Sequence, residues 1–114
     1  MFEGMPDPKS ADSLMAALTA HDDDTVRAAC AVNLARFTDD PRVVDALIVA
    51  LGDPAADVRR CAAQSLAECR GKLDGAASEE AEACLTVALR DPHIEVREQA
   101  RAALDALGLG PPAD

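Results

Sequence analysis

The stretch DPAADVRRCAAQSL, residues 53–66, has two related copies elsewhere in the chain. The upstream copy reads HDDDTVRAACAVNL at 21–34, and the downstream copy reads DPHIEVREQARAAL at 91–104. Each copy has an acidic turn, then a Val-Arg pair, a run rich in Ala, and a Leu at a fixed distance from the Val. Such recurrence is typical of a repeat architecture, in which neighbouring units bury a shared core.

The part of each copy that follows the Val has the spacing of an amphipathic helix. Counted from the Val, offsets 0, 4, 7, 8 and 11 fall within an arc of about 100° on a helix. In the first copy these positions hold Val26, Cys30, Asn33, Leu34 and Phe37. The polar Asn33 corresponds to Ser65 and Ala103, which indicates that this position requires a small residue because helices approach closely there.

A second helix is expected before each of these helices. The clearest lies within residues 39–53, where Asp40 can cap the helix and Pro41 suits its first position. Its apolar stripe has the i, i+3, i+4, i+7 spacing of a helix face and consists of Val44, Leu47, Ile48 and Leu51.

The counterparts of this helix in the other two copies have weaker signals. Upstream, Ser10 or Asp12 is the candidate cap. Downstream, the stretch GKLDGAAS at 71–78 is expected to be a linker, and a helix is expected to follow Ser78 because acidic residues fill the next turn.

The pattern D-P-x-x-x-V-R-x-x-A-A-x-x-L resembles HEAT repeats, especially the short bacterial type first noted in phycobilisome lyases. The second copy matches it at Asp53, Pro54, Val58, Arg59, Ala62, Ala63 and Leu66, and the third at Asp91, Pro92, Val96, Arg97, Ala100 and Leu104. The resemblance and the period together predict an all-α superhelix, or solenoid, of three HEAT-like helix pairs. The expected segments are a flexible N-terminal segment at 1–9, a HEAT-repeat domain at 10–108 with repeats at about 10–38, 39–70 and 78–108, and a C-terminal tail at 109–114.

The resemblance also implies a structural role for the repeated charged residues. In HEAT-like repeats the turn Asp and the Arg after the Val commonly form a ladder of ion pairs and hydrogen bonds between neighbouring repeats. The implied ladder consists of Arg27, Asp53, Arg59, Asp91 and Arg97. His21 occupies the position of the turn Asp in the first copy. A guanidinium can bind a carboxylate and the free carbonyls of a turn together, so these residues need no catalytic role.

The composition argues against nucleic acid as a partner. Eleven Lys and Arg stand against 21 Asp and Glu, and the formal net charge of −10 repels phosphate backbones. Base-stacking platforms are missing because the chain has only two Phe and no Trp or Tyr. The sequence contains neither a membrane-spanning stretch nor an export signal, so we expect a cytoplasmic protein with no membrane partner.

Catalytic and cofactor-binding motifs are not found in the sequence. The cysteines have no CxxC spacing and lie within apolar helical patterns, so we expect reduced core residues at Cys30, Cys61, Cys69 and Cys84. His21 with Asp22–Asp24 could form a metal corner, but capping and the helix dipole explain consecutive acids more simply. HEAT-like di-iron hydroxylases need His-Glu pairs, whereas His21 and His93 precede Asp22 and Ile94. We therefore expect no enzyme activity, metal or cofactor.

A protein or peptide partner is expected on the face of the second helices opposite their core arc, which in a HEAT-type solenoid lines the concave side. Offsets 2, 5, 6 and 9 from each Val belong to this face, including Ala31 and Ala63 at offset 5. The candidate contact residues are Ala28, Val32, Ala35, Arg60, Gln64, Glu98, Arg101 and Asp105. Alternatively, the apolar end of this face could be covered by the N-terminal segment through Phe2 and Met5.

The sequence therefore predicts a non-enzymatic interaction module, such as an adaptor or regulatory subunit, that binds a protein or peptide. The alternative is an accessory subunit, or a lyase- or chaperone-like factor, that acts on a cofactor-bearing protein. The oligomeric state is expected to be a monomer or a weak homodimer. A homodimer would use apolar solenoid ends, which carry Met15, Ala16 and Ala17 in the first helix and Ala100, Ala103, Ala106, Leu107 and Leu109 at the end of the last.

Overall fold

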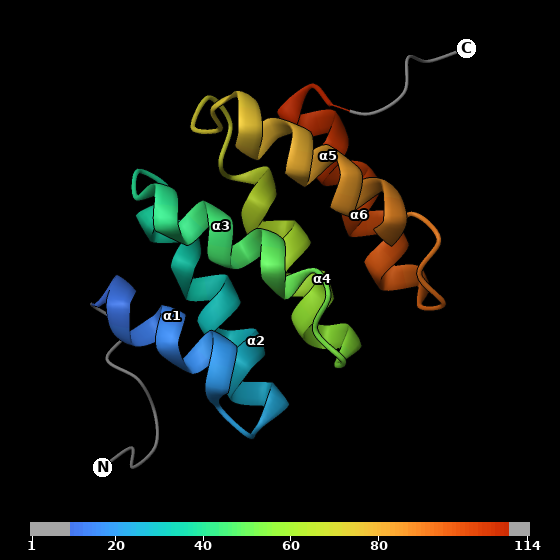
Figure 1. Cartoon of the computed structure of the whole chain (residues 1–114). Helices are drawn as coiled ribbons and strands as arrows, with labels where there is room; N and C mark the ends of the chain where they lie inside the picture. Colours follow the sequence, from blue (N-terminus) through green and yellow to red (C-terminus); the bar gives the residue numbers. More distant parts are fainter. Residues whose placement is uncertain (1–9, 110–114) are drawn as a thin grey trace.

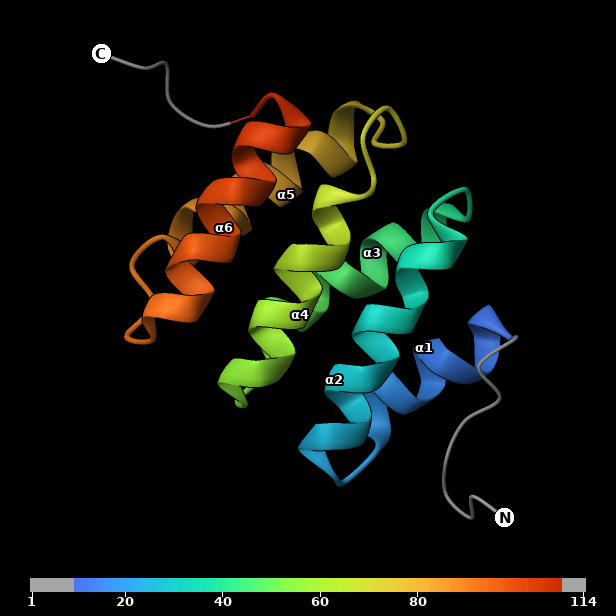
Figure 2. The same ribbon diagram turned by 180° about the vertical axis from the view of Figure 1, so that it is seen from behind.

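The computed structural model describes residues 10–109 and arranges their helices in two layers (Figure 1; Figure 2). One layer contains α1 (Ala11–Ala20), α3 (Pro41–Ala50) and α5 (Gly75–Ala88). The other layer contains α2 (Asp24–Asn33), α4 (Ala56–Ala67) and α6 (Ile94–Leu107), and a short 3₁₀ helix, η1 (Leu34–Phe37), continues α2. Residues 10–109 contain no strand, and the predicted all-α fold of three helix pairs is confirmed.

Local capping explains where the first and third helices begin. The carboxylate of Asp40 accepts a backbone hydrogen bond of 3.0 Å, and Pro41 occupies the first position of α3, as the sequence predicts. At α1 the cap is Ser10 rather than Asp12, because the Ser10 Oγ accepts the N–H of Ser13 at 3.2 Å. These starts depend only on side chains close in sequence.

The third helix pair begins earlier than predicted. α5 starts at Gly75 because the carboxylate of Asp74 accepts the N–H of Ala77 at 2.7 Å and caps the helix. Ser78, the residue expected before the helix, therefore lies inside it. The expected linker shortens to residues 71–74, where Gly71 makes a left-handed turn with φ of 75°.

The sequence predicts one continuous helical face from Val26 to Phe37. In the structure α2 ends at Asn33, and the chain tightens into the 3₁₀ helix η1. The Asn33 side-chain amide donates to the carbonyl of Ala29 at 3.0 Å, and such side-chain bonds to the backbone compete with the helical ladder. Leu34 is still fully buried and Phe37 half-buried, so the apolar face keeps its direction.

The core lies between the layers and consists mainly of Ala, Val, Leu and Cys side chains. Positions of the predicted arc are buried in all three repeats, including Cys30, Leu34, Val58, Leu66, Val96 and Leu104. Ser65 is the buried polar residue of the described core, and its hydroxyl donates to the carbonyl of Ala31 at 2.6 Å. This bond joins α4 to α2 at the position where the sequence indicates close helix approach.

The prediction of an apolar surface at the end of the last helix is wrong in part. Ala100 and Ala103 are fully buried in the core, so neither is available to a second copy. Small side chains fill this position because α6 packs closely against α4 and α5. Ala106, Leu107 and Leu109 are half-buried, and at the other end Ala16 is exposed.

Candidate functional site

A shallow hollow lies between α2–η1 and α4 on the second layer of helices. It is lined by Val32, Ala35, Arg36, Gln64, Ser65 and Glu68. Val32 is 45% exposed, and Arg36, Gln64 and Glu68 are exposed beside it. An apolar centre with a polar rim is the usual anatomy of a protein-binding surface.

This hollow brings together three of the predicted contact residues, Val32, Ala35 and Gln64. Sequence reasoning missed Arg36 and Glu68, which belong to the same rim. Both lie ten residues after the Val of their repeat, one place beyond the offsets assigned to the face. Their common offset is the signal that would have identified them.

The remaining predicted contact residues lie outside this hollow. Arg60 is half-buried and lines a second hollow between the N-terminal ends of α4 and α6, with Asp57, His93 and Glu95. Its Nη2 lies 3.8 Å from the Asp57 carboxylate. The other four predicted residues line neither hollow: Ala28 is half-buried, and Glu98, Arg101 and Asp105 are exposed.

One of the offsets assigned to the partner face is wrong. Ala31 and Ala63, at offset 5, are fully buried rather than exposed. The carbonyl of Ala31 accepts the hydroxyl of Ser65 in the next repeat, so offset 5 faces the following repeat. Arg101 has the same offset in the last repeat and is exposed, which places it at the C-terminal edge of the solenoid.

Arg27 joins the first repeat to the second. Its Nε and Nη2 bind the two carboxylate oxygens of Asp53 at 3.0 and 3.1 Å, while Nη1 donates to the carbonyl of His21 at 2.8 Å. The side chains of Arg27 and Asp53 are only 13% and 10% exposed. The guanidinium thus links its own turn to the turn of the following repeat.

Arg59 joins the second repeat to the third in the same way. Its Nε and Nη2 bind the carboxylate of Asp91 at 2.7 and 3.1 Å, and Nη1 donates to the carbonyls of Asp53 and Pro54. The hydrogen bond from Arg59 lowers the pKa of Asp91 to about 2. Asp91 is therefore ionised throughout the neutral and mildly acidic range.

The two ends of this ladder differ from its middle. Arg97 donates through Nη1 to the carbonyl of Asp91 at 2.7 Å, and no described carboxylate lies within ion-pair distance of it. At the other end, the ring Nδ1 of His21 accepts the N–H of Asp23 at 3.1 Å. The carboxylates of Asp53 and Asp91 accept the equivalent N–H groups in their turns, so His21 replaces the Asp locally.

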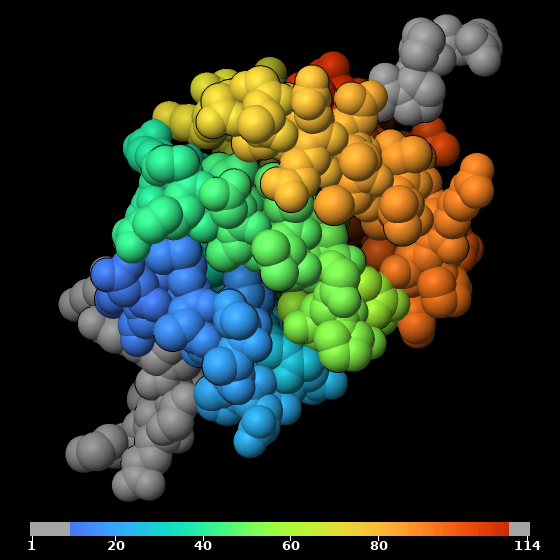
Figure 3. Space-filling model, viewed as in Figure 1, coloured from blue at the N-terminus to red at the C-terminus, as the bar shows by residue number. Residues whose placement is uncertain are grey.

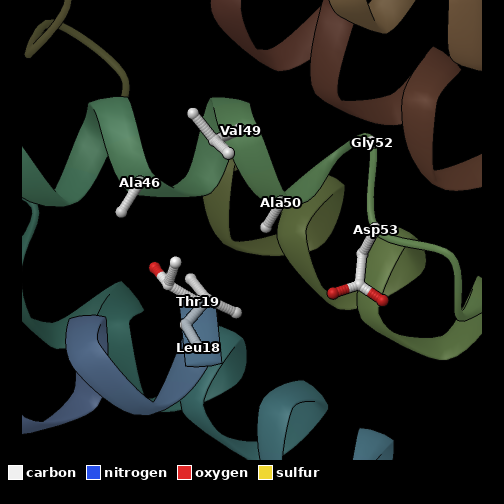
Figure 4. Close-up of a pocket in the computed structure, with 7 residues that line it drawn as sticks. All are labelled: Leu18, Thr19, Ala46, Val49, Ala50, Gly52 and Asp53. Carbon is white, nitrogen blue, oxygen red and sulfur yellow. The ribbon is translucent and has the colours of Figure 1, made fainter. Parts of the chain in front are cut away.

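The outer layer, formed by α1, α3 and α5, presents a continuous surface in chain order (Figure 3). A hollow between α1 and α3 is lined by Leu18, Thr19, Ala46, Val49, Ala50, Gly52 and Asp53 (Figure 4). Ala46 and Ala50 lie across it from Leu18 and Thr19. Because the Asp53 carboxylate is already bound by Arg27, this hollow offers little polar chemistry to a ligand.

The cysteines and acidic residues of the described part of the chain do not gather into a metal-binding group. Burial raises the pKa of all four thiols, and that of Cys69 to about 11, which disfavours the nucleophilic thiolate. Residues 10–109 contain no group of three or more His, Cys, Asp or Glu side chains placed to hold a metal. Among the same residues, no helix is long and apolar enough to cross a membrane.

Comparison with known proteins bears on the architecture. A family model described as HEAT repeats matches residues 11–105, which include all six α-helices apart from the last two residues of α6. The match is to HEAT repeats in general and does not identify the phycobilisome-lyase subtype. No curated protein matches the chain.

Proposed function

Because this chain belongs to the HEAT-repeat family, we propose that it is a non-enzymatic module that binds a protein or peptide through the layer of α2, α4 and α6. HEAT repeats generally mediate protein–protein interaction, and in solenoids of this type the second helices line the concave side. The observation that carries the proposal is Val32, an exposed apolar side chain in a hollow with charged and polar walls.

The residues around Val32 define the chemistry of the proposed partner. Val32 and Ala35 would contact an apolar side chain, while Arg36, Gln64 and Glu68 would contact polar groups around it. Such an arrangement gives affinity through the buried centre and specificity through the rim. With a net charge of −10, the chain would also attract a basic partner more rapidly at low salt.

The test is a charge placed in the hollow and a matched charge placed outside it. Val32→Asp should reduce capture of a partner from native cell extract, because a carboxylate would replace the apolar centre. Val87→Asp is the control, since Val87 is 74% exposed on α5 in the outer layer. Equal capture by both variants and the unmodified chain, with unchanged helicity, would exclude the hollow as the binding site.

A second variant tests whether the two hollows act together. Arg60→Glu reverses a charge in the hollow between α4 and α6 without touching Val32. If one partner spans both hollows, this variant and Val32→Asp should each weaken capture of the same protein. Loss of capture in Val32→Asp alone would restrict the interface to α2, η1 and α4.

A further inference from the structure

Three arginines occupy the same position in three repeats, but among residues 10–109 only Arg27 and Arg59 have a carboxylate partner. Arg27 and Arg59 each use Nη1 for their own turn and the Nε–Nη2 edge for the Asp of the next repeat. Arg97 keeps the first contact, through Nη1 to the carbonyl of Asp91. Its Nε and Nη2 make no hydrogen bond or ion pair with another described residue, and this planar edge has the donor geometry that a carboxylate accepts.

The surroundings of Arg97 also differ from those of the other two arginines. Arg101 lies one helical turn further along α6, at the offset where Ala31 and Ala63 are buried by the next repeat. The C-terminal edge therefore presents two guanidinium groups one turn apart, in a chain whose net charge is −10. Exposed Glu98 and Asp105 lie on the same helix, so a partner carboxylate would be recognised here by the fixed guanidinium donors rather than by a general positive charge.

We propose that this edge, defined by Arg97 and Arg101, binds an aspartate in a helix-starting turn of a partner protein. The chain itself shows twice what fits: Asp53 and Asp91 each accept the N–H two residues later, at 2.8 and 2.9 Å, while the arginine binds both oxygens. A partner with the same turn supplies a carboxylate already oriented for the Nε–Nη2 edge.

A second copy of the chain presents no aspartate at the ladder position, because its exposed Asp23 lies two residues later and caps α2. Its exposed end carries His21 at the ladder position, and the Nδ1 of that ring already accepts the N–H of Asp23. A neutral imidazole has one acceptor nitrogen, so it cannot receive the two parallel N–H groups that Asp53 and Asp91 receive. A partner protein that carries such a turn therefore fits this edge better than a second copy does, and the site is separate from the hollow around Val32.

The test follows the arginine Nε–H resonances of the full chain by NMR. Arg27 and Arg59 provide internal references for a carboxylate-bound guanidinium. The probe is a blocked synthetic peptide with the sequence of residues 91–107, which carries the aspartate turn, and the control is the same peptide with Asp91→Asn. We expect the aspartate peptide to move the Arg97 resonance toward the two references and to bind about tenfold more tightly than the control.

Two chain variants locate the effect. Arg97→Gln should abolish the difference between the peptides, whereas Val32→Asp should leave it unchanged, which separates this site from the proposed function. An equal response to both peptides, or none, would overturn the proposal. Two further results would overturn it. In the first, the Arg97 resonance of the free chain already matches the references and shifts away from them when the chain is ended at Leu109. In the second, Arg97→Gln dissociates a homodimer.

Discussion

Arg59 shows how one residue can fix the relation between two repeats. Its carbon stem lies on α4, Nη1 satisfies the carbonyls of its own turn, and Nε and Nη2 bind the carboxylate of Asp91. Lys could supply the charge but not this set of donors, because its ammonium lacks the planar fork. The repeated Arg is therefore a geometric requirement as well as an electrostatic one.

The ion pair between Arg59 and Asp91 predicts a dependence of stability on acid pH. The pKa of Asp91 is lowered from 3.8 to about 2, so its contribution to stability is complete above pH 3.8 and is lost as the pH falls toward 2. At pH 7, Asp91→Asn should lower the free energy of unfolding by about 2 kcal/mol. The difference from the unmodified chain should shrink between pH 4 and pH 2 in urea unfolding experiments.

Asp45→Asn is the matched control for this experiment, since Asp45 is exposed on α3 and makes no ion pair among residues 10–109. This variant should unfold like the unmodified chain at every pH. If the unfolding free energies of Asp91→Asn and the unmodified chain differed by the same amount from pH 7 to pH 2, the Arg59–Asp91 ion pair would not be the cause of the loss of stability in acid.

Ser65 provides a second prediction at the level of one side chain. Ser65→Ala removes the 2.6 Å hydrogen bond to the carbonyl of Ala31 at a buried contact between α4 and α2. We expect a loss of about 1–2 kcal/mol in unfolding free energy, equivalent to a decrease of about 4–8 °C in the melting temperature of a domain of this size. Thr86→Ala, which removes an exposed hydroxyl on α5, should leave the melting temperature nearly unchanged. Equal decreases in melting temperature for the two variants would show that the buried hydrogen bond of Ser65 does not stabilise the fold.

Among the helices, α5 shows where local sequence reasoning succeeds and where it fails. The existence of a helix there was predicted from the acidic residues that follow Ser78. Asp74 and Ser78 are both acceptable caps, and only the hydrogen bond of Asp74 decides between them. The start of α3 was unambiguous because Asp40 is followed by Pro41. Boundaries were thus predictable where two independent signals coincide.

The competing caps of α5 make an element-level prediction. Asp74→Ala should lower the free energy of unfolding by about 1 kcal/mol, because the N–H of Ala77 loses its acceptor at the helix start. Ser78→Ala should be neutral or slightly stabilising, since Ala is favoured inside a helix. Thermal melts followed by circular dichroism distinguish the two starts: the reverse order of effects would mean that the helix begins after Ser78.

The candidate site was only partly predictable for a related reason. Helical offsets placed Val32 and Gln64 on the outward face of their own helices, α2 and α4, and both side chains line one hollow. Such a placement needs only the geometry of each single helix. The same offsets placed Ala31 on that surface as well, although the next repeat buries it. The direction from which the neighbouring repeat approaches is a tertiary property, and no spacing within one helix contains it.

At the scale of the whole molecule, the three repeats form a one-dimensional array. α4 contacts α2 on one side and α6 on the other, and the Arg27–Asp53 and Arg59–Asp91 pairs couple its repeat to each neighbour. In such arrays stability is approximately a sum of repeat terms and nearest-neighbour terms. The two ion pairs should therefore report on different halves of the chain.

Hydrogen exchange of the backbone amides tests this arrangement. In the unmodified chain we expect the slowest exchange in α4, because it is packed on both sides and its buried positions include Val58, Ala62, Ala63 and Leu66. Asp91→Asn keeps the local turn acceptor but removes the charge that Arg59 binds, so exchange should become several-fold faster mainly in α5 and α6. Asp53→Asn should have the corresponding effect mainly in α1 and α2. A uniform acceleration by both variants would show instead that the three repeats open as a single cooperative unit.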